Sequence, residues 1–330
     1  MASFSQFGND LYTGKRSYDF VGKKYLWYGI AIAMIVAALG ITMLRGGFEF
    51  GIEFSGGSQF EISDTQNLDQ KFAATSVTDE IRTANPRVTI IGGKSVRIQT
   101  DSLSSAQNDQ LRDALAKAYK VDREEVATSY IGATWGADIT STAVRGLLTF
   151  LVLAAIVMAL YFRTWKMSLA AMIALLHDLI ITAGVYGVLQ FEVTPAAVIG
   201  FLTILGYSLY DTVVVFDKIR ENTTEDGGES RRTFSESVNL AVNQTLVRSI
   251  NTSVVALLPV GAILFIGAVF LGAGTLRDIS LALFIGMLVG TYSTIFIAAP
   301  MYAHLRSAED AISKQSKKVM QSCKSSAITE

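Results

Sequence analysis

Long runs of apolar residues, separated by short polar segments, occupy most of the chain outside one region near its beginning. A helix needs about 20 such residues to cross the hydrocarbon core of a bilayer. Six runs approach or exceed this length: Tyr25–Leu44, Gly146–Phe162, Ser168–Leu189, Pro195–Phe216, Leu246–Leu271 and Ile279–Leu305. The pattern therefore predicts an α-helical membrane protein with six transmembrane helices.

The region between the first and second runs has a different periodicity. Four segments have the alternating or β-branched pattern of strands: Ser58–Ser63, Arg87–Ile91, Lys94–Thr100 and Val126–Ile131. Gly92-Gly93 can close a tight hairpin turn between the second and third of them. Helical patterns at Ser76–Ala84 and Ser104–Tyr119 complete the order βαββαβ, which predicts a small ferredoxin-like α+β domain. This scaffold is common and indicates a fold, not a function.

Basic residues are concentrated at the two chain ends and in two connections between spans. They are Lys15, Arg16, Lys23, Lys24, Arg163, Lys166, Lys218, Arg220, Arg231, Arg232, Arg306, Lys314, Lys317, Lys318 and Lys324. The connections Gln190–Thr194 and Gly272–Thr275 hold no Lys or Arg. The positive-inside rule then puts both termini in the cytoplasm. We expect a cytoplasmic segment at 1–24, a first helix at 25–44, an extracytoplasmic α+β domain at 45–145, a membrane domain at 146–305 and a cytoplasmic tail at 306–330.

The first span could be mistaken for a secretory signal, because basic residues precede it. Its apolar run is too long for an ordinary signal sequence, and Leu44-Arg45-Gly46-Gly47 lacks a small-x-small cleavage pattern. We therefore expect this helix to be retained. The single cysteine, Cys323, lies in the polar C-terminal tail, so the α+β domain has no internal disulfide and depends on its own core.

A glycine-rich motif, Gly51-Ile52-Glu53-Phe54-Ser55-Gly56-Gly57, links the first span to the α+β domain. Such a loop can cradle a phosphate, but this one lacks the Gly-Lys-Ser/Thr ending of a P-loop. The simpler interpretation is a tight turn into the domain where only glycine fits, at Gly51, Gly56 and Gly57 around Glu53.

The fourth span carries an acid, Asp211, inside its apolar run. A carboxylate at such a position is costly and normally faces a partner or a water-filled path. Helical spacing places Gly200, Ile204, Tyr207 and Ser208 on the same face, and the small and polar members favour contact with another helix.

The fifth span begins with a polar stripe of Gln244, Arg248, Asn251 and Thr252 at helical spacing. Because the fourth and fifth spans are antiparallel, Asp211 and Arg248 can lie at a similar depth. Such a pair could bind and release a proton as the helices move. The structural alternative is that Arg248 reaches toward the inner surface while Asp211 fixes a helix contact. Spacing alone favours neither of the two.

His177-Asp178 lies within the third span. Adjacent helical residues point about 100° apart, so the two are not expected to face each other. We interpret Asp178 as a second buried acid and His177 as an interhelical hydrogen-bonding residue. No zinc-like ligand spacing and no nucleophile–base set is present in the sequence, so an enzyme is the least favoured function.

These motifs resemble the SecF group of the SecD/SecF family, membrane subunits of bacterial protein export within the RND superfamily. The resemblance rests on Gly51–Gly57, His177-Asp178, Gly206–Asn222 and Asn243–Arg248, and it covers nearly the whole chain. It implies an RND-type half that pairs with SecD, joins the SecYEG channel with YajC, and uses the proton-motive force to promote export of unfolded secretory proteins.

The resemblance also places the proton-coupling acid and arginine on Asp211 and Arg248. It implies the bacterial cytoplasmic membrane as location, protons as coupling ion, no other cofactor and no nucleic-acid partner. Two positions depart from the family pattern: Tyr210 stands where Asn is common, and Lys218 where Arg is common. The alternatives are half of an RND-type exporter of small molecules or lipids, and a scaffold of the translocase that moves no protons.

Overall fold

A computed structural model describes residues 4–91, 93–162, 164–224, 232–267 and 274–326. Six of its helices are long and apolar enough to cross a membrane, which confirms the predicted architecture. They are α2 (Lys24–Leu44), α6 (Ala133–Phe162), α7 (Trp165–Leu189), α8 (Pro195–Thr224), α9 (Phe234–Ala262) with its π-helical extension η2 (Ile263–Gly267), and the continuous helix α11 (Gly274–Ser293), η3 (Thr294–Ala298) and α12 (Ala299–Ser307).

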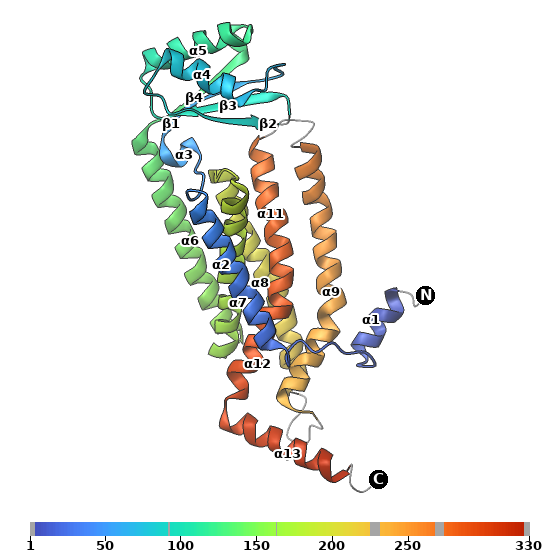
Figure 1. Cartoon of the computed structure of the whole chain (residues 1–330). Coiled ribbons are helices and arrows are strands. Elements are labelled where there is room, and N and C mark those ends of the chain that lie inside the picture. The colour runs from blue at the N-terminus through green and yellow to red at the C-terminus, as the bar shows by residue number, and fades with distance from the viewer. Residues whose placement is uncertain (1–3, 92, 163, 225–231, 268–273, 327–330) are drawn as a thin grey trace.

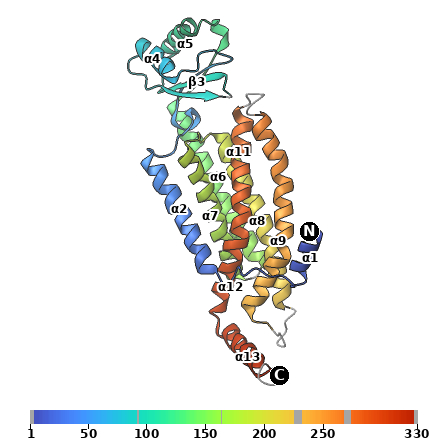
Figure 2. The same cartoon turned by 45° about the vertical axis from the view of Figure 1, so that its right-hand side comes forward.

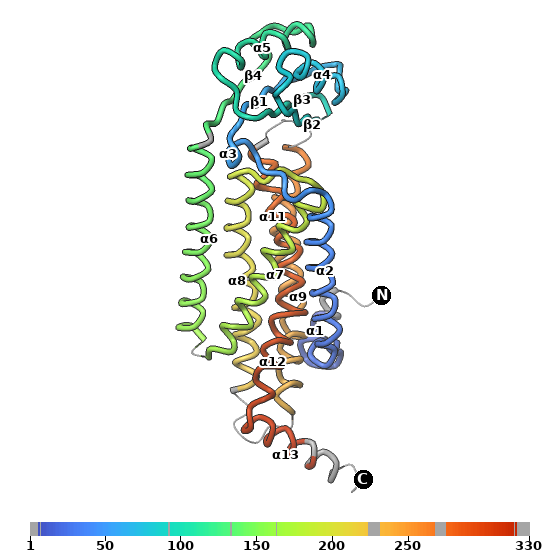
Figure 3. Tube along the Cα trace, turned by 60° about the vertical axis from the view of Figure 1, so that its left-hand side comes forward, coloured from blue at the N-terminus to red at the C-terminus, as the bar shows by residue number. Residues whose placement is uncertain are grey.

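The bundle carries the α+β domain at one end and both described chain ends at the other (Figure 1). Two further helices, α1 (Phe4–Tyr12) and α13 (Asp310–Ser326), lie at the end remote from the domain. Helices α2 and α6 lie at the periphery, while α7, α8 and α11 form the centre (Figures 2 and 3).

Two spans begin well before their apolar runs. Helix α6 begins at Ala133, where the sequence predicted Gly146, and α9 begins at Phe234, where it predicted Leu246. Hydrophobicity marks the part of a helix that fits a bilayer, whereas hydrogen bonding and caps set its ends. The cap of α9 is Thr233, which forms a capping box with Glu236. The predicted end of the fifth span, Leu271, lies outside the described residues.

The α+β domain has the predicted element order, and the strands form a sheet in the order β2-β3-β1-β4. All three neighbouring pairs are antiparallel, as in a ferredoxin-like fold. The strands are β1 (Gly57–Ile62), β2 (Arg87–Ile91), β3 (Ser95–Thr100) and β4 (Val126–Ile131). The short helix α3 (Ile52–Ser55) precedes β1. The connections between strands contain α4 (Gln70–Glu80), α5 (Ser105–Tyr119) and the turn η1 (Arg123–Glu125).

Helices α4 and α5 cover one face of this sheet, and a single apolar core lies between them (Figure 1). Phe60 and Ile98 of the sheet and Leu111 and Leu115 of α5 are fully buried there. The prediction of a helix at Ser76–Ala84 was wrong in its limits, because Asp69 caps the helix by accepting from the Lys71 amide at 2.9 Å. In the predicted hairpin, Gly93 has φ +69° and Gly92 lies outside the described residues.

Helices α8 and α11 approach closely at three successive turns, and this contact organises the membrane domain. A Cβ atom added to Gly200 would lie 2.6 Å from Cβ of Ala282, and one added to Gly286 would overlap the Ile204 side chain. One turn further on, a Cβ at Gly290 would lie 3.2 Å from Cβ of Ser208. Small residues at four-residue spacing let two backbones approach in this way. The contact fixes the Tyr207–Asp211 face of α8 against its neighbours.

Candidate functional site

Asp211 lies in the interior of the bundle, with 6% of its surface exposed. Its Oδ1 accepts a hydrogen bond of 2.9 Å from the Ser249 hydroxyl of α9. Its Oδ2 is buried and has no hydrogen-bond partner among the described residues. A carboxyl group with one unpartnered oxygen in an apolar span is costly, especially when ionised. It is therefore poised to gain a proton or another partner.

Arg248 lies at the predicted depth, because the next residue, Ser249, contacts Asp211. Its side chain, however, is on the exposed side of α9, and the described residues include no ion pair between Arg248 and Asp211. The expected direct pair is therefore not formed in this structure. The physical reason is the rotation of α9 about its axis, which turns Ser249 inward and the preceding residue outward by about 100°.

The same rotation of α9 turns the other residues of the predicted stripe away from the bundle interior. Asn251 is exposed and Thr252 half-buried, while Gln244 accepts from the Asn222 amide at 2.9 Å and donates to the Tyr12 carbonyl at 3.1 Å. The polar face that does meet the interior consists of Thr245, Ser249 and Ser253, which are all buried. These hydroxyl residues recur every four positions, and that spacing was the signal that sequence reasoning missed.

Asp178 of α7 is the second buried acid, as predicted, with 1% of its surface exposed. Its Oδ2 accepts from the Ser208 hydroxyl of α8 at 2.5 Å. The expectation for His177 was wrong in two respects: its Nδ1 lies 3.2 Å from Oδ1 of Asp178, and its Nε2 is buried without a partner among the described residues. Side-chain torsion brings the two neighbours together although their Cβ atoms diverge.

Further hydroxyl contacts extend this polar layer across the bundle. Tyr207 donates to Ser253 at 3.4 Å, and Ser253 and Thr291 of α11 are hydrogen-bonded at 2.6 Å. Thr212 and Thr294 are hydrogen-bonded at 3.1 Å, one turn beyond the Ser208–Gly290 contact. The layer thus joins α7, α8, α9 and the α11–η3 helix around the two acids.

The layer contains more hydrogen-bonding groups than its internal hydrogen bonds use. The His177 Nε2, the Asp211 Oδ2, the Thr182 hydroxyl and the Tyr292 hydroxyl are buried and without partners among the described residues. Buried polar atoms are normally satisfied by protein groups or ordered water, so a cluster of exceptions indicates a candidate functional site. No group of three potential metal ligands was found within the described ranges.

The glycine-rich motif forms the tight turn that its residues predicted. Ile52–Ser55 is the short helix α3, after which Gly56 and Gly57 adopt φ of +71° and +144°. A Cβ atom at Gly57 would overlap the carbonyl oxygen of Thr100, so only glycine fits. Oε2 of Glu53 is buried and lacks a partner among the described residues. Gly51 donates from its amide to the Val193 carbonyl at 3.0 Å, which ties this turn to the connection between α7 and α8.

A second polar cluster, absent from the sequence predictions, joins the α+β domain to the bundle. Arg97 of β3 bridges Glu61 at 3.3 Å and Glu192 at 3.4 Å. Glu192 lies in the α7–α8 connection and also accepts from Gln99 at 2.5 Å. Nearby, Thr194 donates to Asp278 of α11 at 2.8 Å. The cluster links the sheet to the ends of α8 and α11 nearest the domain, and these helices also carry part of the polar layer.

Comparison with known proteins gives consistent matches along the chain. Residues 110–308 match the family described as protein export membrane protein SecD/SecF, C-terminal. The protein translocase subunit SecF of Streptomyces coelicolor is 44% identical over 321 residues, covering 97% of this chain and 85% of that protein. SecF of Mycobacterium tuberculosis is 40% identical and covers 94% of this chain and 72% of its own length.

The crystal structure of SecDF, a translocon-associated membrane protein from Thermus thermophilus, has the same fold. It matches 88% of this chain with a TM-score of 0.77 and 29% sequence identity. The match covers 39% of the SecDF chain, so the present chain corresponds to well under half of that longer protein.

Proposed function

The chain belongs to the SecD/SecF family of protein-export membrane proteins, and from this premise we propose that it is the SecF-type half of a unit that uses the proton-motive force to promote protein export. The observation that carries the proposal is Asp211, a buried intramembrane carboxyl group held by a single serine. An acid in this setting, inside a span of a translocase relative, suits reversible proton binding.

The proposed cycle uses the two faces of α9. Protonated Asp211 is neutral, and one hydrogen bond from Ser249 stabilises it in an apolar setting. Ionised Asp211 needs a cation, and Arg248 is the single basic residue of α9. Partial rotation of α9, or a swing of the long arginine side chain, would bring the guanidinium to the carboxylate. Proton binding and release would thus be coupled to the orientation of α9 relative to α8.

The proposed partner is SecD. Arg248 and Asn251 are exposed on α9 although this helix is apolar enough to span a membrane, and polar residues on such a face favour contact with another helix rather than lipid. The name of the SecDF relative indicates that it combines a SecD and a SecF half in one chain, and the present chain corresponds to a part of it. We further propose SecYEG, YajC and unfolded secretory proteins as partners, as the family resemblance implies.

We propose the bacterial cytoplasmic membrane as the location, with both termini cytoplasmic and the α+β domain on the opposite side. The domain then acts mechanically on exported chains and not as an enzyme. The Arg97–Glu192 ion pair offers the physical link, because it connects the domain to the segment that leads into α8, the helix that carries Asp211. Protons are the proposed coupling ion, and no other cofactor is needed for this cycle.

The experiment is proton-dependent protein export in proteoliposomes that contain the complete translocase. Asp211→Asn keeps the size and hydrogen bonding of the side chain but cannot titrate, and Arg248→Met removes the cation. We expect both variants to assemble normally and to lose the enhancement of export by a proton gradient. Asp217→Asn is the matched control. Asp217 lies near the C-terminal end of the same helix and accepts a hydrogen bond from the Tyr161 hydroxyl. Full enhancement in Asp211→Asn would reject the proposal and would favour the alternative function, a translocase scaffold that moves no protons.

A further inference from the structure

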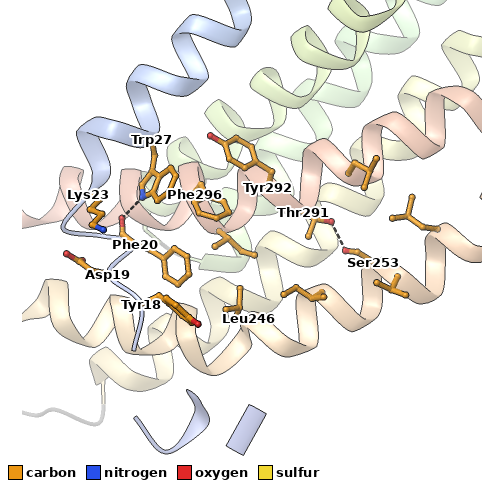
Figure 4. A pocket seen from close by; sticks show the side chains of 15 residues that line it. Tyr18, Asp19, Phe20, Lys23, Trp27, Leu246, Ser253, Thr291, Tyr292 and Phe296 are labelled. Carbon is orange, nitrogen blue, oxygen red and sulfur yellow. Dashed lines mark hydrogen bonds between the residues drawn. The ribbon is translucent and has the colours of Figure 1, made fainter. Parts of the chain in front are cut away.

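An apolar pocket of about 660 Å³ lies in the half of the bundle that carries the chain ends (Figure 4). Its walls are α9, α11, η3 and the start of α2, and Tyr18, Asp19, Phe20 and Lys23 close one side of it. We call the segment 17–23, which contains these four residues, the N-terminal strap. Ile250, Val254 and Leu288 line the pocket and are 40%, 50% and 50% exposed. The pocket is therefore open to the side of the bundle, at a level where a bilayer would surround these apolar helices.

The interior of the pocket is mainly apolar, and the Tyr292 hydroxyl is its one lining group that is buried without a partner among the described residues. Most of its lining is aliphatic or aromatic, including Leu246, Leu257, Ile295 and Phe296. Ser253 and Thr291, at the deep end, bond each other at 2.6 Å (Figure 4). Cavities with such walls exclude water. The interior therefore suits a hydrocarbon chain.

The mouth of the pocket is polar and preformed. Asn239 accepts from the Phe20 amide at 2.9 Å, and Asn243 accepts from the Tyr18 amide at 2.8 Å, so α9 holds the N-terminal strap in place. The Trp27 indole donates to the Phe20 carbonyl at 3.1 Å (Figure 4). This geometry keeps the mouth open without a ligand.

One positive charge at this mouth, that of Lys23, lacks a partner among the described residues. Lys23 is exposed, and the described residues give its ammonium group no hydrogen bond or ion pair. The only acid in the lining, Asp19, accepts from the Gly22 amide at 2.7 Å within the strap itself. An anionic group at the level of lipid headgroups would therefore be attracted here.

We propose that this pocket binds an anionic phospholipid from the leaflet that faces the chain ends, with one acyl chain in the apolar interior and the phosphate at Lys23. The pocket volume is in the range of about 300–1,000 Å³ typical of small-ligand sites. The proposal does not depend on proton coupling, and its test can succeed or fail independently of it.

The test is native mass spectrometry of the full chain, purified in mild detergent and mixed with equal amounts of phosphatidylglycerol and phosphatidylcholine of identical acyl chains. Leu257→Trp fills the pocket and should reduce bound lipid at least five-fold. Leu258→Trp, one residue away and 67% exposed outside the lining, should not. Lys23→Gln should lower the preference for phosphatidylglycerol about five-fold, because one basic residue near an anionic headgroup contributes about that factor. Lys15→Gln is its control, since Lys15 is not part of the lining.

A second measurement avoids any effect of Leu257→Trp on folding. The chain has three tryptophans, so Trp135→Phe combined with Trp165→Phe leaves only Trp27, which lines the pocket. Brominated acyl chains should quench Trp27 more strongly in phosphatidylglycerol than in phosphatidylcholine, and Lys23→Gln should remove the difference. Equal quenching by both lipids in the parent, or equal lipid binding in Leu257→Trp and Leu258→Trp, would overturn the proposal. Loss of the lipid when the chain is co-purified with a partner subunit would also overturn it, because a polypeptide would then cover the pocket.

Discussion

The contact between α8 and α11 should tolerate no added methyl group at Gly286. A Cβ atom there would overlap Cγ1 of Ile204 and lie 2.9 Å from its Cγ2. Because Ile204 is 1% exposed, it has no open space into which it can move. Overpacking of a close-packed interior typically costs about 1–3 kcal/mol. We expect Gly286→Ala to lower the free energy of unfolding by this amount, although alanine is the better helix former.

Gly206→Ala is the matched control on the partner helix, because nothing lies within 4 Å of its added Cβ atom. This control should be neutral or stabilising by up to about 1 kcal/mol through helix propensity. Ile204→Ala should remove the overlap, so the double variant with Gly286→Ala should be less destabilised than the sum of the two single variants by about 0.5–3 kcal/mol. The assay is reversible unfolding in mixed detergent micelles, followed by tryptophan fluorescence. If Gly286→Ala unfolds at the same denaturant concentration as Gly206→Ala, the inferred close contact is wrong.

Three further outcomes follow from individual contacts. Ser249→Ala removes the hydrogen bond to Asp211 and should lower the free energy of unfolding by about 1–3 kcal/mol. Ser249→Thr keeps the hydroxyl group and should retain most of the parental stability, so equal stability of the two variants would contradict the contact. Glu192→Gln removes one of the two acids that Arg97 bridges, and hydrogen exchange should accelerate in β3 and in the α7–α8 connection but not in α5; unchanged exchange would mean that the bridge does not hold the domain. Asn243→Ala removes the side chain that bonds the Tyr18 backbone, so exchange of the Tyr18 amide should rise at least ten-fold, and protection equal to the parent would show that the N-terminal strap is held elsewhere.

The strands of the α+β domain were predictable because their signals are local. Arg87–Ile91 and Val126–Ile131 have the limits that the sequence indicated, and Gly93 provides the turn residue of the hairpin. The limits of the membrane helices were less predictable. Apolar composition shows which part of a helix can lie in a bilayer, but it does not show where the helix begins. The capping box at Thr233 therefore begins α9 well before the apolar run.

The polar site was predictable in its acids but not in its contacts. Asp178 and Asp211 are conspicuous because charge is rare in apolar spans. The partner of Asp211 depends on the rotation of α9, and a turn of one residue exchanges Arg248 for Ser249. Tertiary packing sets that rotation, through contacts of α9 with its neighbours such as the Ser253–Thr291 hydrogen bond. The stripe of Gln244, Arg248, Asn251 and Thr252 did not reveal it, whereas the four-residue spacing of Thr245, Ser249 and Ser253 marks the buried face.

The central claim is that Asp211 takes up and releases protons during export, and proton flux tests it most directly. The complete translocase is reconstituted into vesicles with a pH-sensitive dye inside, and flux is recorded while a secretory protein is translocated. We predict flux in the parent and in Asp217→Asn, and none above the vesicle background in Asp211→Asn with the complex shown to be assembled. Parental flux in the assembled Asp211→Asn complex would contradict the account.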